Sequence, residues 1–118
     1  MAEQDESFKN ITSQDFPAQV LQADRMVIVN FSSGKSGACQ IFDPEFMAIS
    51  KEYRGRVTFA RLNIDDVGKD DTLVSEWNVD GIPTVIFFKE GHEINRIKGV
   101  VMRDKLRRQI EGVLLAHF

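Results

Sequence analysis

Hydrophobic and polar positions alternate along the chain in short blocks that predict strands and helices in turn. Five segments predict strands, the first of them a short edge strand: 8–12, 27–31, 56–64, 84–88 and 93–98. The run 27–31 is apolar enough to be buried on both faces of a sheet. Residues 89–92 supply turn chemistry between the last two strands, which we therefore expect to form a β-hairpin.

The segments between these strands show helical periodicity. Apolar residues three or four positions apart predict four helices, with these inward-facing residues: Phe16 and Val20; Cys39, Phe42, Phe46, Ile49 and Tyr53; Leu73, Val74 and Trp77; Met102, Leu106, Ile110 and Val113. Thr12–Asp15 resembles a capping box before the first helix, and Pro44 predicts a kink near the start of the second. The order βαβαβαββα predicts an α/β fold, a central mixed β-sheet flanked by helices.

Composition limits the classes of protein to which the chain can belong. With 118 residues and 42% hydrophobic content, we expect one compact domain over 8–118 after a loose polar segment at 1–7. The net charge of −3 argues against nucleic-acid partners. Because no apolar stretch is long enough to span a membrane and the first residues are acidic, we expect no membrane association and a cytoplasmic protein with a reduced thiol.

The only cysteine, Cys39, ends the tetrapeptide Ser36-Gly37-Ala38-Cys39 between a buried strand and a helix. A Cys-x-x-Cys pair in this setting becomes redox active, because a helix N-terminus favours the thiolate. A hydroxyl has no accessible anion near neutral pH without a base beside it, so Ser36 can neither attack a disulfide nor close one onto Cys39. We expect Ser36 to cap the helix, and Cys39 to be either an inert buried thiol or a slow former of mixed disulfides.

Other kinds of site find weak support. Gly34-Lys35-Ser36 imitates the end of a phosphate-binding loop, but Val29 stands at the required earlier glycine, so we expect no nucleotide. No histidine lies near Ser36 in the sequence, which argues against a Ser-His-acid triad. The acidic run at 65–71 lacks the EF-hand spacing and predicts a solvated loop. The sequence therefore predicts neither a metal site nor a cofactor.

Several stretches at their observed spacings resemble a thioredoxin from about Phe8 to Leu115: 16–24, 36–39, Pro44, 60–65, 81–84 and 98–100. The resemblance implies the thioredoxin fold, with the family's nucleophilic cysteine at Ser36 and its resolving cysteine at Cys39. It places the family's buried aspartate at Asn30, whose amide does not titrate, and the neighbouring lysine at Arg61. Lys35 and Ser32 replace two family aromatic residues. These departures imply a redox-silent or altered member, in which Asn30 and Arg61 form a satisfied polar pair.

The peptide-binding half of the family's site is retained in the sequence. The resemblance implies a cis bond between Ile82 and Pro83, which presents the backbone of Ile82 to an extended partner segment. Ala38, Gly99 and Val100 would surround this dock. Lys35 beside it would favour acidic partners. The alternative is that Pro83 only begins a strand.

Two function classes follow from these residues. The first is a binding module that holds protein or peptide segments in a chaperone-like or adaptor role. The second is a thiol-disulfide oxidoreductase in cell redox homeostasis, which acts either as a monothiol through Cys39 or as a dithiol thioredoxin in which Ser36 has replaced the first cysteine.

Overall fold

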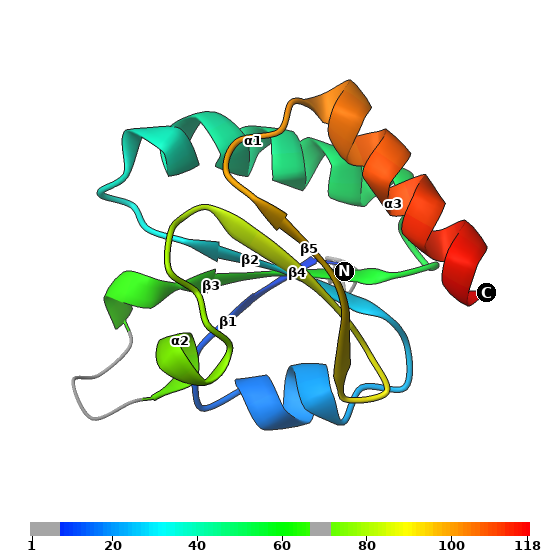
Figure 1. The fold of residues 1–118 in the computed structure, drawn as a ribbon, viewed down its shortest axis with the longest axis horizontal. Coiled ribbons are helices and arrows are strands. Elements are labelled where there is room, and N and C mark those ends of the chain that lie inside the picture. Colours follow the sequence, from blue (N-terminus) through cyan, green and yellow to red (C-terminus); the bar gives the residue numbers. More distant parts are fainter. Residues whose placement is uncertain (1–7, 67–71) are drawn as a thin grey trace, which may run out of the picture.

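The computed structural model describes residues 8–66 and 72–118, and a five-stranded sheet runs through its centre (Figure 1). The strands are β1 (Phe8–Ile11), β2 (Val27–Ser32), β3 (Thr58–Asn63), β4 (Thr84–Lys89) and β5 (His92–Lys98). Their spatial order is β1-β3-β2-β4-β5. The first three are parallel, while β4 is antiparallel to β2 and β5 antiparallel to β4. The predicted α/β fold with a mixed sheet is confirmed.

The central strand β2 explains why its sequence is a continuous apolar run. It pairs with β3 on one side and β4 on the other, and all six of its residues are buried. Successive side chains point to opposite faces of a strand, and both faces of this sheet are covered. Ile28 packs into the core on one face and Val29 into the core on the other.

Helices cover the sheet in two layers. Figure 1 shows α1 (Gly37–Glu52) and α3 (Arg103–His117) above the sheet, with η1 (Pro17–Leu21) and α2 (Leu73–Glu76) below it. A single 3₁₀ turn, η2 (Ile64–Asp66), follows β3. Phe42, Phe46 and Phe59 belong to the upper core, whereas Phe16 and Phe88 belong to the lower one. The upper layer contains the Ser36 segment, because α1 begins directly after that residue.

The buried face predicted for α1 is confirmed. Its members Cys39, Phe42, Phe46 and Ile49, together with Tyr53 at the C-cap, are all buried. The helix continues through Pro44 to Glu52. Two ion pairs join α1 to α3, Glu45 to Arg103 at 3.2 Å and Glu52 to Arg107 at 2.7 Å.

The first predicted helix has the expected inward residues but a different backbone. Phe16 and Val20 are buried, and the capping box before them forms, with Thr12 N donating to Asp15 Oδ2 at 3.1 Å and Asp15 N donating to Thr12 Oγ1 at 3.3 Å. The segment is a π-helix and not an α-helix, since Gln22 N bonds to Pro17 O five residues earlier, at 2.9 Å.

The expectation that Met102 faces the core is wrong. Its side chain is 54% exposed, and Val101, at 7%, is buried in its place. The reason is that α3 begins at Arg103 and Met102 has an extended backbone, so helical periodicity does not apply to it. The predicted segment 1–7 and residues 67–71 of the predicted acidic loop lie outside the described residues.

Candidate functional site

The strand register brings three sequence segments to one end of the sheet. Phe31 of β2 pairs with Thr84 of β4, and Thr84 pairs with Lys98 of β5. The residues after Phe31, before Thr84 and after Lys98 therefore leave the sheet at the same end (Figure 1). These segments contain Ser36, the Ile82-Pro83 pair and Gly99-Val100, which the sequence analysis assigned to one site.

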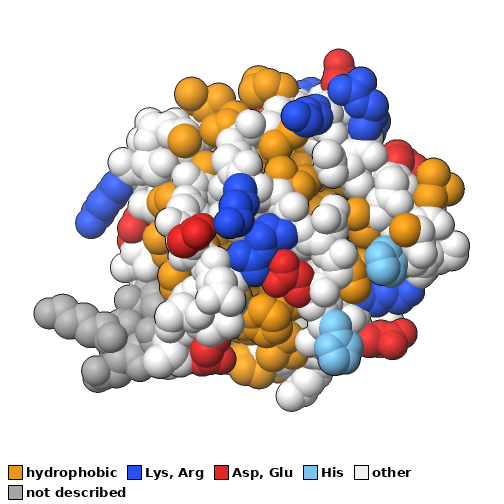
Figure 2. Space-filling model, viewed as in Figure 1, with side chains coloured by type: hydrophobic (Ala, Val, Ile, Leu, Met, Phe, Trp, Pro, Cys, Tyr) orange, Lys and Arg blue, Asp and Glu red, His pale blue; other side chains and the backbone are white. Residues whose placement is uncertain are grey.

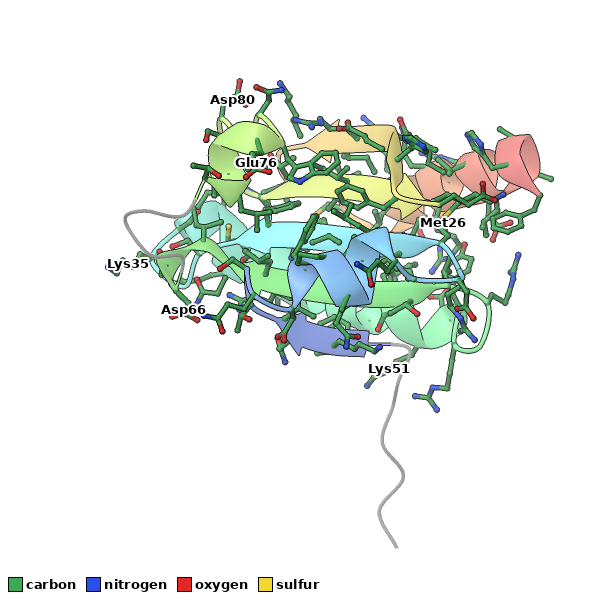
Figure 3. All side chains as sticks on the ribbon, turned by 90° about the horizontal axis from the view of Figure 1, so that it is seen from below. Met26, Lys35, Lys51, Asp66, Glu76 and Asp80 are labelled. Atoms are coloured by element: carbon green, nitrogen blue, oxygen red, sulfur yellow. The ribbon has the colours of Figure 1, made fainter. Side chains whose placement is uncertain are left out.

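The loop between β2 and α1 is fixed by a carboxylate from η2, the turn that follows β3. Ser33 Oγ donates to both carboxylate oxygens of Asp65 at 2.8 Å, and Gly34 N donates to Asp65 Oδ2 at 3.1 Å. Lys35 N in turn donates to Ser33 Oγ at 3.1 Å. Asp65 is exposed, in agreement with the predicted solvated segment, and it also holds the loop through these hydrogen bonds. Lys35 is exposed, at the same end of the molecule as Asp66 and away from Lys51 (Figure 3).

Ser36 and Cys39 have structural roles at the start of α1. Ser36 Oγ accepts a hydrogen bond from Cys39 N at 3.3 Å, which confirms the predicted helix cap. The thiol of Cys39 is completely buried, and Ser33 N donates to Cys39 Sγ at 3.5 Å. The thiol is therefore not presented to solvent as a thiol reaction requires, and the partly exposed Ser36 hydroxyl is engaged with the backbone of α1.

Asp43, an acidic residue that the sequence analysis did not identify, binds several polar side chains beneath this site. Asp43 accepts hydrogen bonds from Asn30 Nδ2 at 2.9 Å and from Arg61 Nε at 2.9 Å. Ser32 Oγ lies 2.9 and 2.8 Å from its two carboxylate oxygens and donates to them. Asp43 thus joins α1 to the two strands β2 and β3.

The sequence predicts a direct contact between the side chains of Asn30 and Arg61, and the structure does not contain it. The two residues are register partners across β2 and β3, but both side chains turn to the carboxylate of Asp43. Carboxylate oxygens accept charge-assisted bonds from a guanidinium, which are stronger than an amide–guanidinium contact. Asn30 Oδ1 is the one buried side-chain oxygen or nitrogen left without a partner in the described ranges 8–66 and 72–118.

A sequence signal for Asp43 does exist. It follows Cys39 by four residues, so the two share one face of α1 with the apolar positions that the periodicity identified. A carboxylate at the margin of a buried face needs partners, and the polar residues Asn30 and Ser32 in the apolar strand β2 supply them.

The predicted dock lies beside this loop. The peptide bond between Ile82 and Pro83 is cis, and Gly99 N donates to Pro83 O at 2.8 Å. Pro83 is buried, whereas Ile82 is partly exposed and Val100 is 40% exposed. Ala38 is also partly exposed. We call the set Ala38, Ile82, Pro83, Gly99 and Val100 the Ile82 dock.

Two further exposed apolar side chains lie next to the Ile82 dock. Ile41 is 59% exposed and Met102 is 54% exposed. The ion pair of Glu45 with Arg103 places the start of α3 beside α1, and Ile41 lies one helical turn before Glu45 on the same side of α1. The hydrophobic surface at this end therefore extends beyond the residues predicted from the sequence.

Comparison with known proteins decides the family. The thioredoxin family model matches residues 7–112. This chain belongs to the thioredoxin family. Thioredoxin X of the chloroplast of Arabidopsis thaliana is 32% identical over 108 residues, which are 90% of this chain and 58% of that protein. A thioredoxin of Rickettsia felis is 32% identical over 82% of this chain and 90% of its own length. A thioredoxin of Porphyra purpurea is 29% identical over 85% of this chain and 91% of its own length.

The described residues contain neither a cluster of metal-ligating side chains nor a membrane-spanning helix. Across 8–66 and 72–118, no three side chains of His, Cys, Asp or Glu are grouped so that they could hold a metal ion. In the same part of this thioredoxin-family chain, no helix combines the length and the apolar character needed to cross a bilayer.

Proposed function

We propose that this thioredoxin-family chain binds extended protein segments at the Ile82 dock without reducing them, in a chaperone-like or adaptor role. The observation that carries the proposal is the state of its two candidate nucleophiles. The only thiol in the 118 residues is completely buried, and the hydroxyl of Ser36 is engaged as a helix cap. With one cysteine, these residues cannot close the internal disulfide that a dithiol reductase needs.

The dock offers what an extended segment would use. Such a segment gains affinity from main-chain hydrogen bonds and specificity from side-chain contacts. Ile82 and Val100 supply exposed apolar surface, and Ile41 and Met102 enlarge it. Lys35, exposed on the neighbouring loop, would favour acidic segments through a screened attraction.

A binding measurement with paired variants tests the dock. We expect a labelled, reduced and carboxymethylated client protein to bind the chain, and Val100→Asp to weaken that binding because a charge replaces apolar contact. Leu115→Asp is the matched control, since Leu115 is an exposed apolar residue on α3, 81% accessible. Equal affinities of the two variants would contradict the proposed dock.

An activity measurement tests the absence of reduction. We expect no insulin reduction by the chain itself with dithiothreitol as electron donor. Activity that appears in Ser36→Cys would show that the scaffold is competent and that one missing thiol accounts for the loss. If the original chain reduces insulin, the non-reducing function is wrong.

A second function, that of a monothiol acting through Cys39, is favoured by one contact. Ser33 N donates to Cys39 Sγ at 3.5 Å, so the sulfur lies against the loop between β2 and α1. When the chain opens at this loop, the Cys39 thiolate would attack one sulfur of a disulfide, form a mixed disulfide and release the other sulfur as a thiolate. Incubation with oxidised glutathione would then add one glutathionyl group to the native chain by mass spectrometry, and none to Cys39→Ser.

A further inference from the structure

Four basic residues of α3 divide into two pairs by the elements they face. Arg103 and Arg107 meet the acidic residues Glu45 and Glu52 of α1. Lys105 and Arg108 line a groove between α3 and β5, and neither forms an ion pair within the described ranges. The α1 side of the helix is thus charge-balanced inside the chain, whereas the β5 side is not.

The groove has a volume of about 480 Å³ and runs along α3 from Lys105 to His117. Its apolar surface comes from Ile94 of β5 and from Val113 and Ala116 of α3. Among the described residues, no Asp or Glu lines it, although the chain as a whole carries a net charge of −3. The groove is therefore a locally basic strip on an acidic protein, and its charge is complementary to that of an acidic ligand.

The strand beside the groove is an edge of the sheet. β5 ends the strand order, and β4 is its one partner in the described sheet. An edge strand presents unpaired backbone N–H and C=O groups, to which another extended segment can add. Figure 2 shows Lys and Arg side chains gathered over α3 at the upper right, with hydrophobic side chains between them and β5.

We propose that this groove binds an extended acidic segment of a partner protein along the β5 edge. Carboxylates of the segment pair with Lys105 and Arg108, and its apolar side chains rest on Ile94 and Val113. A guanidinium binds a carboxylate through two parallel hydrogen bonds, which favours Arg108 as the stronger contact. A small phosphate would use the cations alone and leave both the apolar surface and the free strand edge without a role.

This surface is separate from the Ile82 dock. The dock lies at the end of the sheet where β5 leads into Gly99, whereas the groove lies between the middle of β5 and the face of α3 that carries Lys105 and Arg108, and it shares no residue with the dock. The inference therefore stands whether or not the dock binds a client, and variants at the two places distinguish them.

The test uses charge reversal in matched pairs. The probe is a short labelled peptide that alternates Asp or Glu with Val, measured by fluorescence anisotropy at moderate salt against a peptide with Lys in place of the acids. We expect K105E/R108E to weaken binding of the acidic peptide by a factor on the order of 10 or more, since reversal replaces attraction by repulsion. The control R25E/K51E makes the same change in net charge at two exposed cations outside the groove.

Three further measurements complete the test. K105Q/R108Q should also weaken binding of the acidic peptide, by a smaller factor than K105E/R108E. This neutral variant replaces K105E/R108E in the test if charge reversal disturbs folding. Lys35→Glu, at the Ile82 dock, should lower only the binding that remains in K105Q/R108Q, which separates the groove from the dock. In NMR spectra of the original chain, the acidic peptide should shift the backbone amide signals of Ile94 and Asn95.

Several outcomes would overturn the proposal. Equal losses in the groove variant and in R25E/K51E would mean that net charge alone attracts the peptide. Full competition by millimolar inorganic phosphate or by a mononucleotide would identify a phosphate site instead. Amide shifts confined to residues 33–39 would place the peptide at the loop and not along β5.

Discussion

Arg61 of β3 donates through Nε to the Asp43 carboxylate of α1 at 2.9 Å, and both side chains are about three-quarters buried. Since Asn30 and Ser32 also donate to Asp43, removal of its charge weakens several bonds at once. This relationship makes Asp43 the residue of the site on which folding should depend most.

Replacement of Asp43 by Asn should lower the free energy of unfolding by about 2 kcal/mol, because hydrogen bonds to charged groups contribute roughly 1.5 to 3 kcal/mol and Arg61 loses its counter-charge. Urea unfolding measures this as a lower midpoint with an unchanged slope. The matched control is Asp66→Asn, an exposed aspartate. Similar midpoints for the two variants would show that the Asp43 bonds contribute little.

Burial of Cys39 predicts slow reaction with thiol reagents. Alkylation of a fully buried sulfur requires the chain to open, so the native rate should lie below the rate in denaturant by a factor on the order of 100 or more. Iodoacetamide labelling followed by mass spectrometry at neutral pH measures both rates. A native rate close to that of an unfolded cysteine peptide would favour the monothiol function.

The sequence predicts the fold well because the spacing of apolar residues shows which positions of each strand and helix are buried. In a sheet covered by helices on both faces, those positions are the ones that point toward the neighbouring layer. The apolar run of β2 and the buried face from Cys39 to Tyr53 illustrate this, since every position in them is buried as predicted. Met102 shows where the approach fails. Periodicity cannot locate the first residue of a helix, and a shift of one position exchanges Met102 with Val101.

The site is less predictable because its polar contacts are long-range. Ser36 as a helix cap follows from local sequence and is confirmed. Asp43 and Asp65 select partners 11 to 32 positions away, and those choices depend on how α1 and the end of β3 pack against β2. A single sequence without its three-dimensional register does not reveal these pairings, so Asn30 and Arg61 were expected to bind each other directly.

Loss of the cap at Ser36 should destabilise α1. Ser36→Ala removes the acceptor for Cys39 N, and such a change lowers stability by about 1 kcal/mol. Ser36→Asp should retain most of the stability, because a carboxylate caps equally well and also interacts favourably with the helix dipole. Thermal unfolding of the three proteins gives the order. If Ser36→Ala matches the original chain, the cap has no energetic role.

Acid stability should depend on Glu52. The hydrogen bond from Arg107 lowers the pKa of Glu52 below its ordinary value of 4.5. As the pH falls, Glu52 is therefore protonated at a higher pH in the unfolded chain than in the folded chain. The ion pair therefore contributes stability above about pH 4.5, and this is lost as the pH falls through the folded pKa. Glu52→Gln should make the fall in stability below that pH shallower, whereas Glu90→Gln, at an exposed turn residue, should not.

A side chain at Gly91, in the turn between β4 and β5, should destabilise the folded chain. The two turn residues have positive φ, 53° at Glu90 and 80° at Gly91, as a tight two-residue hairpin requires. A Cβ at Gly91 would also lie 3.2 Å from the carbonyl oxygen of Leu21. Because a left-handed conformation costs a residue with a Cβ roughly 1 to 2 kcal/mol, Gly91→Ala should lower the free energy of unfolding by at least about 1 kcal/mol.

A helical glycine provides the control for this effect. A Cβ at Gly112 of α3 would meet no atom within 4 Å, and its backbone is helical. Gly112→Ala should therefore raise the free energy of unfolding by about 0.5 to 1 kcal/mol, since alanine loses less backbone entropy in a helix. Urea unfolding of both variants should give shifts of opposite sign. Two shifts of the same sign would mean that the left-handed backbone at Gly91 does not determine the cost of its substitution.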